Sequence, residues 1–268
     1  MTSPRPNGAA HPSPSGQPDP LPGTPPTAGL YREVVLVDRH SHAGKRVLPV
    51  TDWRIAAEMN AVFITGAEFP AAARELPIAF VPVGRGADGK PQVTAVVLTG
   101  LRERENLLVS AEGRWDAGFL PAFLRRYPFA YVRSEGERFS LAVDVAWPGF
   151  NDREGQPLLT EQHEPSAFLA EMMKFLDAFE EESARTRRFC ERLVELDLLR
   201  GGEINGQSAD GQPVQAHGFF MVDEAKLRAL PDEAVLELHR NGVLGLIHTH
   251  LVSMGHVEGL ARRLNARH

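Results

Sequence analysis

The stretch RENLLVSAEGRWDAGFLPAFLRRYPFAYVR, residues 104–133, decides the fold that the sequence predicts. Its pattern predicts a strand at 107–109, a turn, a short helix and a second strand that starts at Phe129. Asp116 is the expected N-cap of the helix, because a short carboxylate accepts hydrogen bonds from the first free backbone N–H groups. The helix should end at Tyr127, since the residue before a proline is pushed out of the helical region. The concentration of aromatic side chains makes this segment the expected nucleus of the core.

The rest of the chain predicts an α+β fold around this nucleus. Residues 30–150 contain short apolar strands joined by tight turns and no strand–helix–strand crossover, which predicts a curved, mostly antiparallel sheet with helical insertions. Residues 165–200 have apolar side chains at helical spacing and predict one long amphipathic helix. Residues 201–268 predict an α/β part with a helical C-terminus. We expect a single domain over residues 30–268.

Several turn and cap signals refine this expectation. Ser134–Glu137 is expected to form a hairpin turn between two strands. Gly201-Gly202 is the expected stop of the long helix, and Asn205-Gly206 and Asp210-Gly211 are turn signals in a polar hairpin. Asp223 is the expected N-cap of a helix near the C-terminus, where the last helix should run from about 243 to 264.

Composition restricts the class of protein. Residues 1–29 hold nine of the 21 prolines and are predicted to be a disordered tail. The net charge of −6 argues against non-specific nucleic-acid binding. No apolar run approaches the ~20 residues that span a bilayer, and no secretory signal is evident. Cys190 is the only cysteine, which excludes an internal disulfide. These observations favour a cytoplasmic protein without membrane insertion.

The candidate metal ligands are His248, His250 and Asp144. Asp144 follows an apolar strand and precedes a tryptophan, so it is either a ligand or general base, or a simple acceptor of backbone N–H groups from the next turn. His248 and His250 diverge by about 200° on a helix and would not share a ligand locally. A metal site would therefore need partners brought together by folding. No Gly-x-Ser-x-Gly, Gly-x-Gly-x-x-Gly or His-Glu-x-x-His motif occurs.

Several stretches together resemble one bacterial protein family. They are Glu68–Phe80, Glu105–Leu108, Gly113–Asp116, Leu120–Phe129, Gly218–Leu227 and Leu236–His239. The combination is similar to the SapC family over about residues 31–263, with the Pro-rich tail outside it. His250, Leu251, Ser253, Gly255 and Leu260 also fit a pattern of this family, and His256 departs from it. The family is named for surface-layer (S-layer) protein secretion, so the resemblance implies a Gram-negative bacterial protein tied to export, uptake or peptide transport, without supplying catalytic residues.

Three hypotheses for the function follow. The first is an accessory protein that binds a peptide or protein partner of a secretion or transport system, without a cofactor, through a surface that contains Trp115, Arg125, Arg126 and Tyr127. The second is a metal-dependent oxygenase or hydrolase acting on such a peptide, with a divalent metal held by His248, His250 and Asp144. The third is a structural partner in an oligomer, with Cys190 and the long helix at the interface. The sequence leaves the oligomeric state open.

Overall fold

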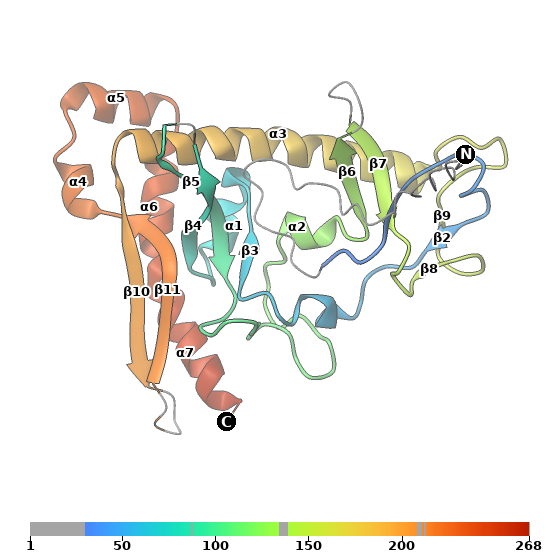
Figure 1. The fold of residues 1–268 in the computed structure, drawn as a ribbon, viewed down its shortest axis with the longest axis horizontal. Coiled ribbons are helices and arrows are strands. Elements are labelled where there is room, and N and C mark those ends of the chain that lie inside the picture. The colour runs from blue at the N-terminus through green and yellow to red at the C-terminus, as the bar shows by residue number, and fades with distance from the viewer. Residues whose placement is uncertain (1–29, 87, 134–138, 208–210, 212, 268) are drawn as a thin grey trace, which may run out of the picture.

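The fold was analysed in a computed structural model, shown as a ribbon in Figure 1. It describes residues 30–86, 88–133, 139–207, 211 and 213–267. The predicted disordered tail over residues 1–29 and the predicted hairpin turn at Ser134–Glu137 lie outside the described residues.

The described strands form three antiparallel sheets, which agrees with the predicted α+β class. The strands are β1 Val34–Leu36, β2 Arg46–Val47, β3 Ala61–Phe63, β4 Ile78–Arg85, β5 Pro91–Leu98, β6 Phe129–Arg133, β7 Phe139–Asp144, β8 Phe150–Asn151, β9 Gln156–Pro157, β10 Leu199–Gln207 and β11 Pro213–Val222. The largest sheet has the order β10-β11-β4-β5-β3, and the two smaller sheets have the orders β1-β7-β6 and β8-β2-β9. The predicted antiparallel pairing is thus distributed over separate sheets.

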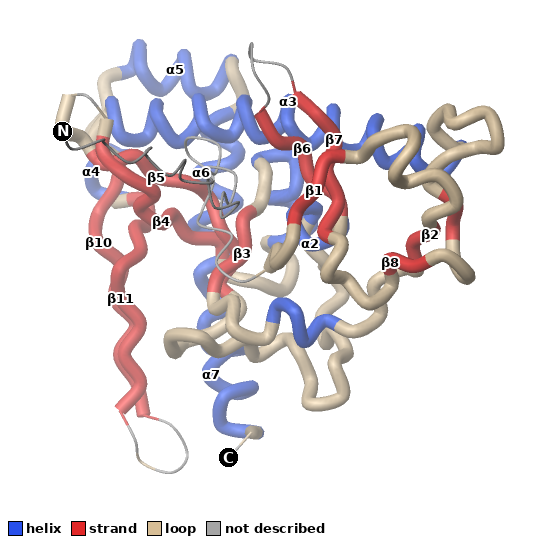
Figure 2. Tube along the Cα trace, turned by 45° about the vertical axis from the view of Figure 1, so that its right-hand side comes forward, coloured by secondary structure: helices blue, strands red, loops and turns tan. Residues whose placement is uncertain are grey.

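The helices pack around these sheets (Figure 2). The α-helices are α1 Phe69–Ala72, α2 Ala122–Arg125, α3 Ala167–Glu195, α4 Glu224–Arg228, α5 Asp232–Arg240, α6 Val243–Ser253 and α7 Val257–Ala266. Three 3-10 helices are η1 Trp53–Ala56, η2 Gly66–Glu68 and η3 Met254–His256. The predicted last helix is therefore divided into α6, η3 and α7. None of the described helices combines the length and apolar character that a bilayer crossing needs.

Helix α3 confirms the predicted long amphipathic helix and runs along the longest axis of the molecule (Figure 1). Its inward face carries Phe179, whose ring centroid lies 5.8 Å from that of Phe63, and Phe189, which lies 5.8 Å from Phe69. The same face buries Cys190, and burial raises the pKa of its thiol to about 12. Cys190 is thus a core residue, which corrects the hypothesis that placed it at an oligomer interface.

The long helix ends earlier than predicted. Its last residue is Glu195, whereas the expected stop signal, Gly201-Gly202, lies inside β10. Asp197 takes a left-handed φ of +52°, and the Leu198 N–H then donates to the Leu193 carbonyl at 2.9 Å. This reversal buries Leu198 completely and starts β10 directly. The prediction that Gly201-Gly202 stop the helix is therefore wrong, because the chain reverses at Asp197, which is not a glycine.

The segment 104–133 contributes buried side chains to the core, among them Leu107, Phe123 and Phe129, but its local structure differs from the prediction. Residues 107–109 form no strand, and only one isolated bridge joins Val109 to Trp115. Helix α2 begins after Pro121, so Asp116 is not its cap. The backbone donors of this loop bond to distant carboxylates instead. The Ala122 N–H donates to Glu68 at 2.7 Å, and the N–H groups of residues 118 and 119 donate to Glu75. The strand predicted from Phe129 is confirmed as β6.

The β10–β11 hairpin is longer than predicted and its far half projects from the body of the molecule (Figure 1). Asn205 and Gly206 do not form the predicted turn, because they pair with Gln215 and Val214 across the hairpin. The register shifts by one residue near Gly218, whose φ is +82°. Beyond the hairpin, the predicted cap is confirmed: Asp223 accepts from the N–H groups at the start of α4. The predicted turn at Asp210-Gly211 lies at the hairpin end, where most residues are not described.

Candidate functional site

Asp144 lies at the end of β7 with no exposed surface. Its two oxygens accept from the backbone N–H groups of Arg32 at 2.9 Å, Glu33 at 3.0 Å and Ala146 at 3.1 Å. The Tyr127 hydroxyl also donates to it at 3.0 Å. Burial, and then the neighbouring Asp144 carboxylate, raise the pKa of Tyr127. Because both carboxylate oxygens are used within the protein, Asp144 ties the chain before β1 to the turn after β7, which is the structural alternative that the sequence left open.

His250 is also fully buried and fully bonded. Its Nε2 accepts from the Val222 N–H at 3.0 Å, and its Nδ1 lies 2.8 Å from the Ile78 carbonyl, which it can only approach as a donor. Burial lowers the pKa of His250 to about 4, in spite of the bond to Ile78. A neutral imidazole that donates with one nitrogen and accepts with the other therefore joins α6 to β4 and β11.

The predicted metal ligands do not come together. His250 has no nitrogen free, and His248 lies on the exposed side of α6. Asp144 lies in the sheet β1-β7-β6, whereas His250 is bonded to β4 and β11 of the five-stranded sheet. Within the described part of the chain, no group of three or more His, Cys, Asp or Glu side chains is arranged to hold a metal ion. The three-ligand set of the enzyme hypothesis is therefore corrected: two of its members are structural, and His248 is separate from them.

Two of the four predicted partner-binding residues are buried. Arg126 is 6% exposed and Tyr127 is 5% exposed, so neither can reach a partner in this conformation. The Arg126 guanidinium lies between the rings of Phe123 at 4.6 Å and Phe179 at 4.8 Å. Its Nη1 lies 3.7 Å from the Glu180 carboxylate. Arg126 thus holds α2 against α3 through cation–π contacts, and the prediction of a surface role for these two residues is corrected.

The other two predicted residues are accessible. Trp115 is half-buried, its indole N–H donates to the Phe119 carbonyl at 2.9 Å, and its ring packs edgewise on Trp53. Arg125 is exposed and its guanidinium lies 5.2 Å from the Phe175 ring centre. Only Trp115 and Arg125 therefore remain candidates for the partner surface that the sequence predicted.

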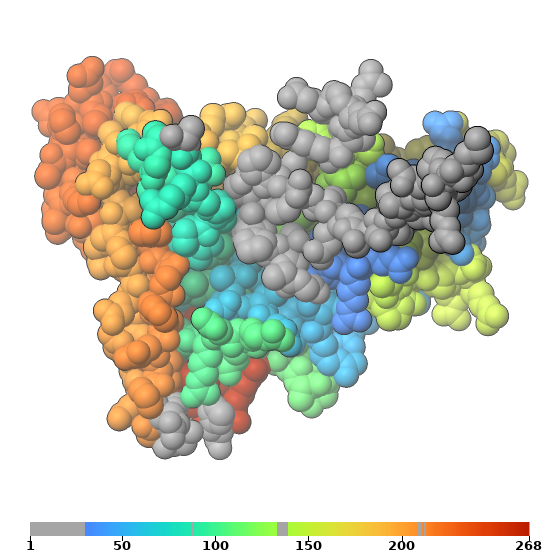
Figure 3. All heavy atoms as spheres, in the orientation of Figure 1, coloured from blue at the N-terminus to red at the C-terminus, as the bar shows by residue number. Residues whose placement is uncertain are grey.

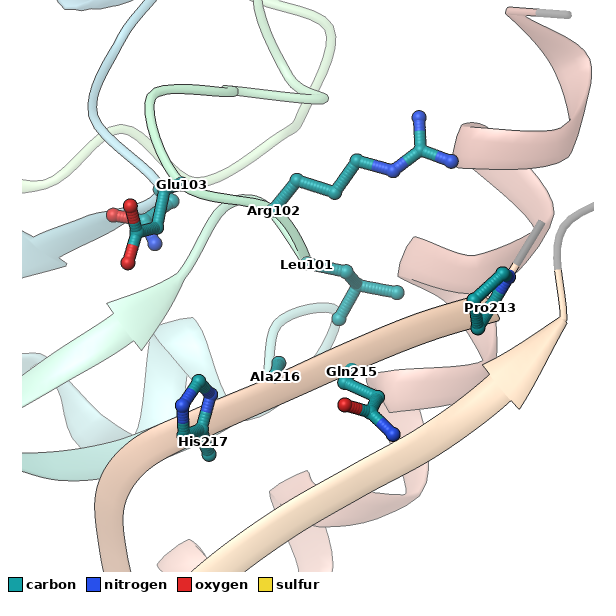
Figure 4. Close-up of a pocket in the computed structure, with 8 residues that line it drawn as sticks. Leu101, Arg102, Glu103, Pro213, Gln215, Ala216 and His217 are labelled. Atoms are coloured by element: carbon teal, nitrogen blue, oxygen red, sulfur yellow. The ribbon is translucent and has the colours of Figure 1, made fainter.

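A pocket of about 500 Å³ lies between the hairpin and the loop after β5 (Figure 4). One wall is the β11 edge, and the other is the loop at residues 101–103, which follows β5. The lining residues are Asn60, Leu101, Arg102, Glu103, Pro213, Gln215, Ala216 and His217. In Figure 3 the green loop after β5 lies beside the orange hairpin, with the red C-terminal helix behind them. The pocket is open and combines apolar, cationic and anionic side chains.

The sequence did not predict this pocket. The only signal was the polar hairpin, in which exposed side chains alternate with the half-buried Ala216 and the buried Val214. The opposite wall comes from a distant part of the chain and carries no motif. Only the packing of β11 beside β4 brings Glu103 and His217 to the same pocket.

The fold and the pocket define a class: an α+β protein with an open pocket of mixed polarity between a hairpin and a loop. The SapC family model matches residues 37–260, which cover most of the chain. The chain therefore belongs to the SapC family, as the resemblance implied. A search of curated proteins and a search of solved structures found no match.

Proposed function

We propose that this SapC-family protein is an accessory protein that binds a peptide or protein partner of a bacterial secretion or peptide-transport system. The single observation that supports the proposal is the open pocket beside β11, about 500 Å³ in volume, because ligand pockets commonly measure roughly 300–1,000 Å³. Its walls carry both charged and apolar side chains, a combination that suits a peptide better than a purely apolar ligand.

Two surfaces are candidates for the partner contact. One is the pocket, where Glu103 and His217 are exposed. The other is the pair Trp115 and Arg125, since aromatic residues and arginine often dominate protein interfaces. The pocket is the stronger candidate, because it is concave and its polar groups come from two separate segments that the fold brings together.

Co-purification tests the proposal directly. The affinity-tagged protein is co-expressed with each protein encoded beside its own gene, and the recovery of each neighbour is quantified by mass spectrometry. We expect a defined neighbour to be recovered by the wild-type protein and lost in the double variant Glu103→Ala/His217→Ala. The double variant Trp115→Ala/Arg125→Ala tests the second candidate surface in the same way. Recovery of no neighbour by the wild-type protein would contradict the proposal.

The metal-dependent enzyme remains the competing hypothesis, and the His248, His250 and Asp144 geometry gives it no support. Metal analysis of the purified protein after incubation with Zn(II), Fe(II) or Mn(II) separates the two functions. One tightly bound metal ion per chain, lost in His250→Ala while the protein stays folded, would favour the enzyme. Melting that is unchanged by these metals would favour the binding function.

A further inference from the structure

β11 has two hydrogen-bonding neighbours over only part of its length. It pairs with β10 from Pro213 to Val222, whereas its registered pair with β4 is Phe220 with Phe80. No residue of the segment 213–217 has a registered pair with β4, and the loop that follows β5 lines a pocket together with this segment. This part of the strand has an edge that the sheet itself does not cover.

The direction of the peptide groups along the hairpin follows from one bond. The Asp223 N–H donates to the Leu198 carbonyl at 2.8 Å, and the residues next to these two, Val222 and Leu199, are paired across the hairpin. In an antiparallel ladder this bond makes Leu199 and Val222 a pair that exchanges no hydrogen bonds, so the peptide groups of Leu199 point away from β11. Peptide groups alternate along a strand, and β10 carries no extra residue where the register shifts. Ile204 therefore directs its N–H and C=O groups toward β11.

The opposite strand has the complementary alternation. Ala216 pairs with Ile204, so its peptide groups point toward β10. Gln215 and His217, on either side of it, direct their N–H and C=O groups to the other edge, where the pocket lies. Among the described residues, neither Gln215 nor His217 has a registered pair on β4, and no turn or loop backbone group bonds to them. Such an edge is a template for an added strand.

The pocket provides the space for that strand. A neighbouring strand lies roughly 4.8 Å away in the hydrogen-bonding direction, and the pocket of about 500 Å³ adjoins the edge. Figure 4 shows the Leu101 side chain directed toward β11, while Arg102 extends away from it. A strand placed here would therefore lie between the β11 edge and a wall that is apolar at Leu101.

Charge selects the kind of peptide. Glu103 is exposed, and within the described part of the chain it forms no ion pair. In Figure 4 its carboxylate lies at the same end of the pocket as His217, and Asn60 also lines the pocket. Arg102 also lines the pocket but extends away from β11 in Figure 4, so the carboxylate of Glu103 is the charged group that favours a cationic side chain on the ligand.

We propose that the β11 edge at residues 213–217 binds an extended peptide segment that carries a basic residue, which adds to the hairpin as a third strand with its cation near Glu103. Binding of this kind takes its affinity from main-chain hydrogen bonds and its selectivity from side-chain pockets. The inference rests on the proposed binding function and specifies where the partner binds and what chemistry it presents.

The hairpin offers a matched pair of variants. Gln215→Pro removes an N–H from the pocket edge, and Asn205→Pro removes one from the outer edge of β10, because Asn205 is the cross-strand neighbour of Gln215. Fluorescence anisotropy of the full chain with a labelled Thr-Val-Lys-Val-Thr-Val peptide is then compared between them. We expect Gln215→Pro to weaken binding by about tenfold or more, and Asn205→Pro to change it by less than about twofold. Glu103→Gln should weaken binding about threefold, and a peptide with Glu in place of Lys should bind more weakly than the Lys peptide.

Hydrogen exchange of the wild-type protein gives a second measurement that does not depend on a variant. Addition of the Lys peptide should protect the amides of Gln215 and His217. Unchanged exchange at both amides, equal binding by Gln215→Pro, or loss of binding only in Asn205→Pro would each overturn the proposal. Self-association that Gln215→Pro abolishes, seen by sedimentation, would also overturn it, because the occupant would then be a second copy. A genome neighbour captured equally by wild type and Gln215→Pro would refute the edge site and leave the binding function intact.

Discussion

The buried interior and the far end of the β10–β11 hairpin differ in how their polar groups are hydrogen-bonded. In the interior, Asp144 and His250 have every oxygen or nitrogen bonded to the protein. At the hairpin, the backbone groups of Gln215 and His217 face a pocket, and within the described part of the chain neither residue has a registered pair on β4. The comparison teaches that the polar residues most conspicuous in the sequence maintain the fold, whereas the open polar edge is suited to binding.

The largest expected effect is that of Asp144→Ala. This substitution removes a buried carboxylate and leaves three backbone N–H groups and the buried Tyr127 hydroxyl without their acceptor, so we expect a loss of about 4 kcal/mol in the free energy of unfolding. Urea denaturation measures it. Asp152→Ala, which removes an exposed ion pair with Lys45, is the control and should cost less than about 1 kcal/mol. An equal loss of stability in the two variants would mean that Asp144 is not buried and fully hydrogen-bonded.

The next effect is the pH dependence of stability. The pKa of His250 is about 4 in the folded protein, below its ordinary value of 6.5, so the unfolded chain binds a proton more readily. Stability from this group is therefore complete above pH 6.5, falls as the pH decreases from 6.5 to 4, and changes no further below that. The total loss is roughly 3 kcal/mol. Urea denaturation between pH 7 and pH 4 should reveal it, and His250→Gln should flatten the curve.

A smaller effect is expected at the cap of α4. Asp223→Ala removes the acceptor for the N–H groups of Ala225 and Lys226, which should cost about 1 kcal/mol. Thermal unfolding measures the change, and Asp223→Asn should restore most of it. A cost above about 3 kcal/mol would indicate that Asp223 has a further role in joining β11 to α4.

The smallest effect is expected at the open edge. Gln215→Pro should change the free energy of unfolding by less than about 1 kcal/mol, because the lost N–H points to the pocket rather than to β10. Val96→Pro, within strand β5, which pairs with both β3 and β4, should cost more than about 3 kcal/mol. Similar costs from urea denaturation would show that the β11 edge is already occupied by the protein itself.

The sequence predicted more of the fold than of the site. The long helix, the Asp223 cap and the strand from Phe129 were correct, because each depends on residues within a few positions of one another. The surface role of Arg126 was wrong, since its burial depends on aromatic rings from α3. The pocket was missed because its two walls are distant in the chain and share no motif.

The sequence by itself determined the α+β class and the antiparallel pairing, because hydrophobic periodicity, turn chemistry and capping act over short distances. It also carried the resemblance to the SapC family, through several stretches that are similar to that family. Only the tertiary structure decided that Glu68 and Glu75, rather than Asp116, accept the bonds of the loop before α2. It also decided that His250 is a neutral link between helix and sheet, and that Glu103 and His217 line one pocket. The physical reason is the same in each case: a hydrogen bond or a pocket wall requires atoms within a few ångströms, and for residues far apart in the chain folding sets that distance.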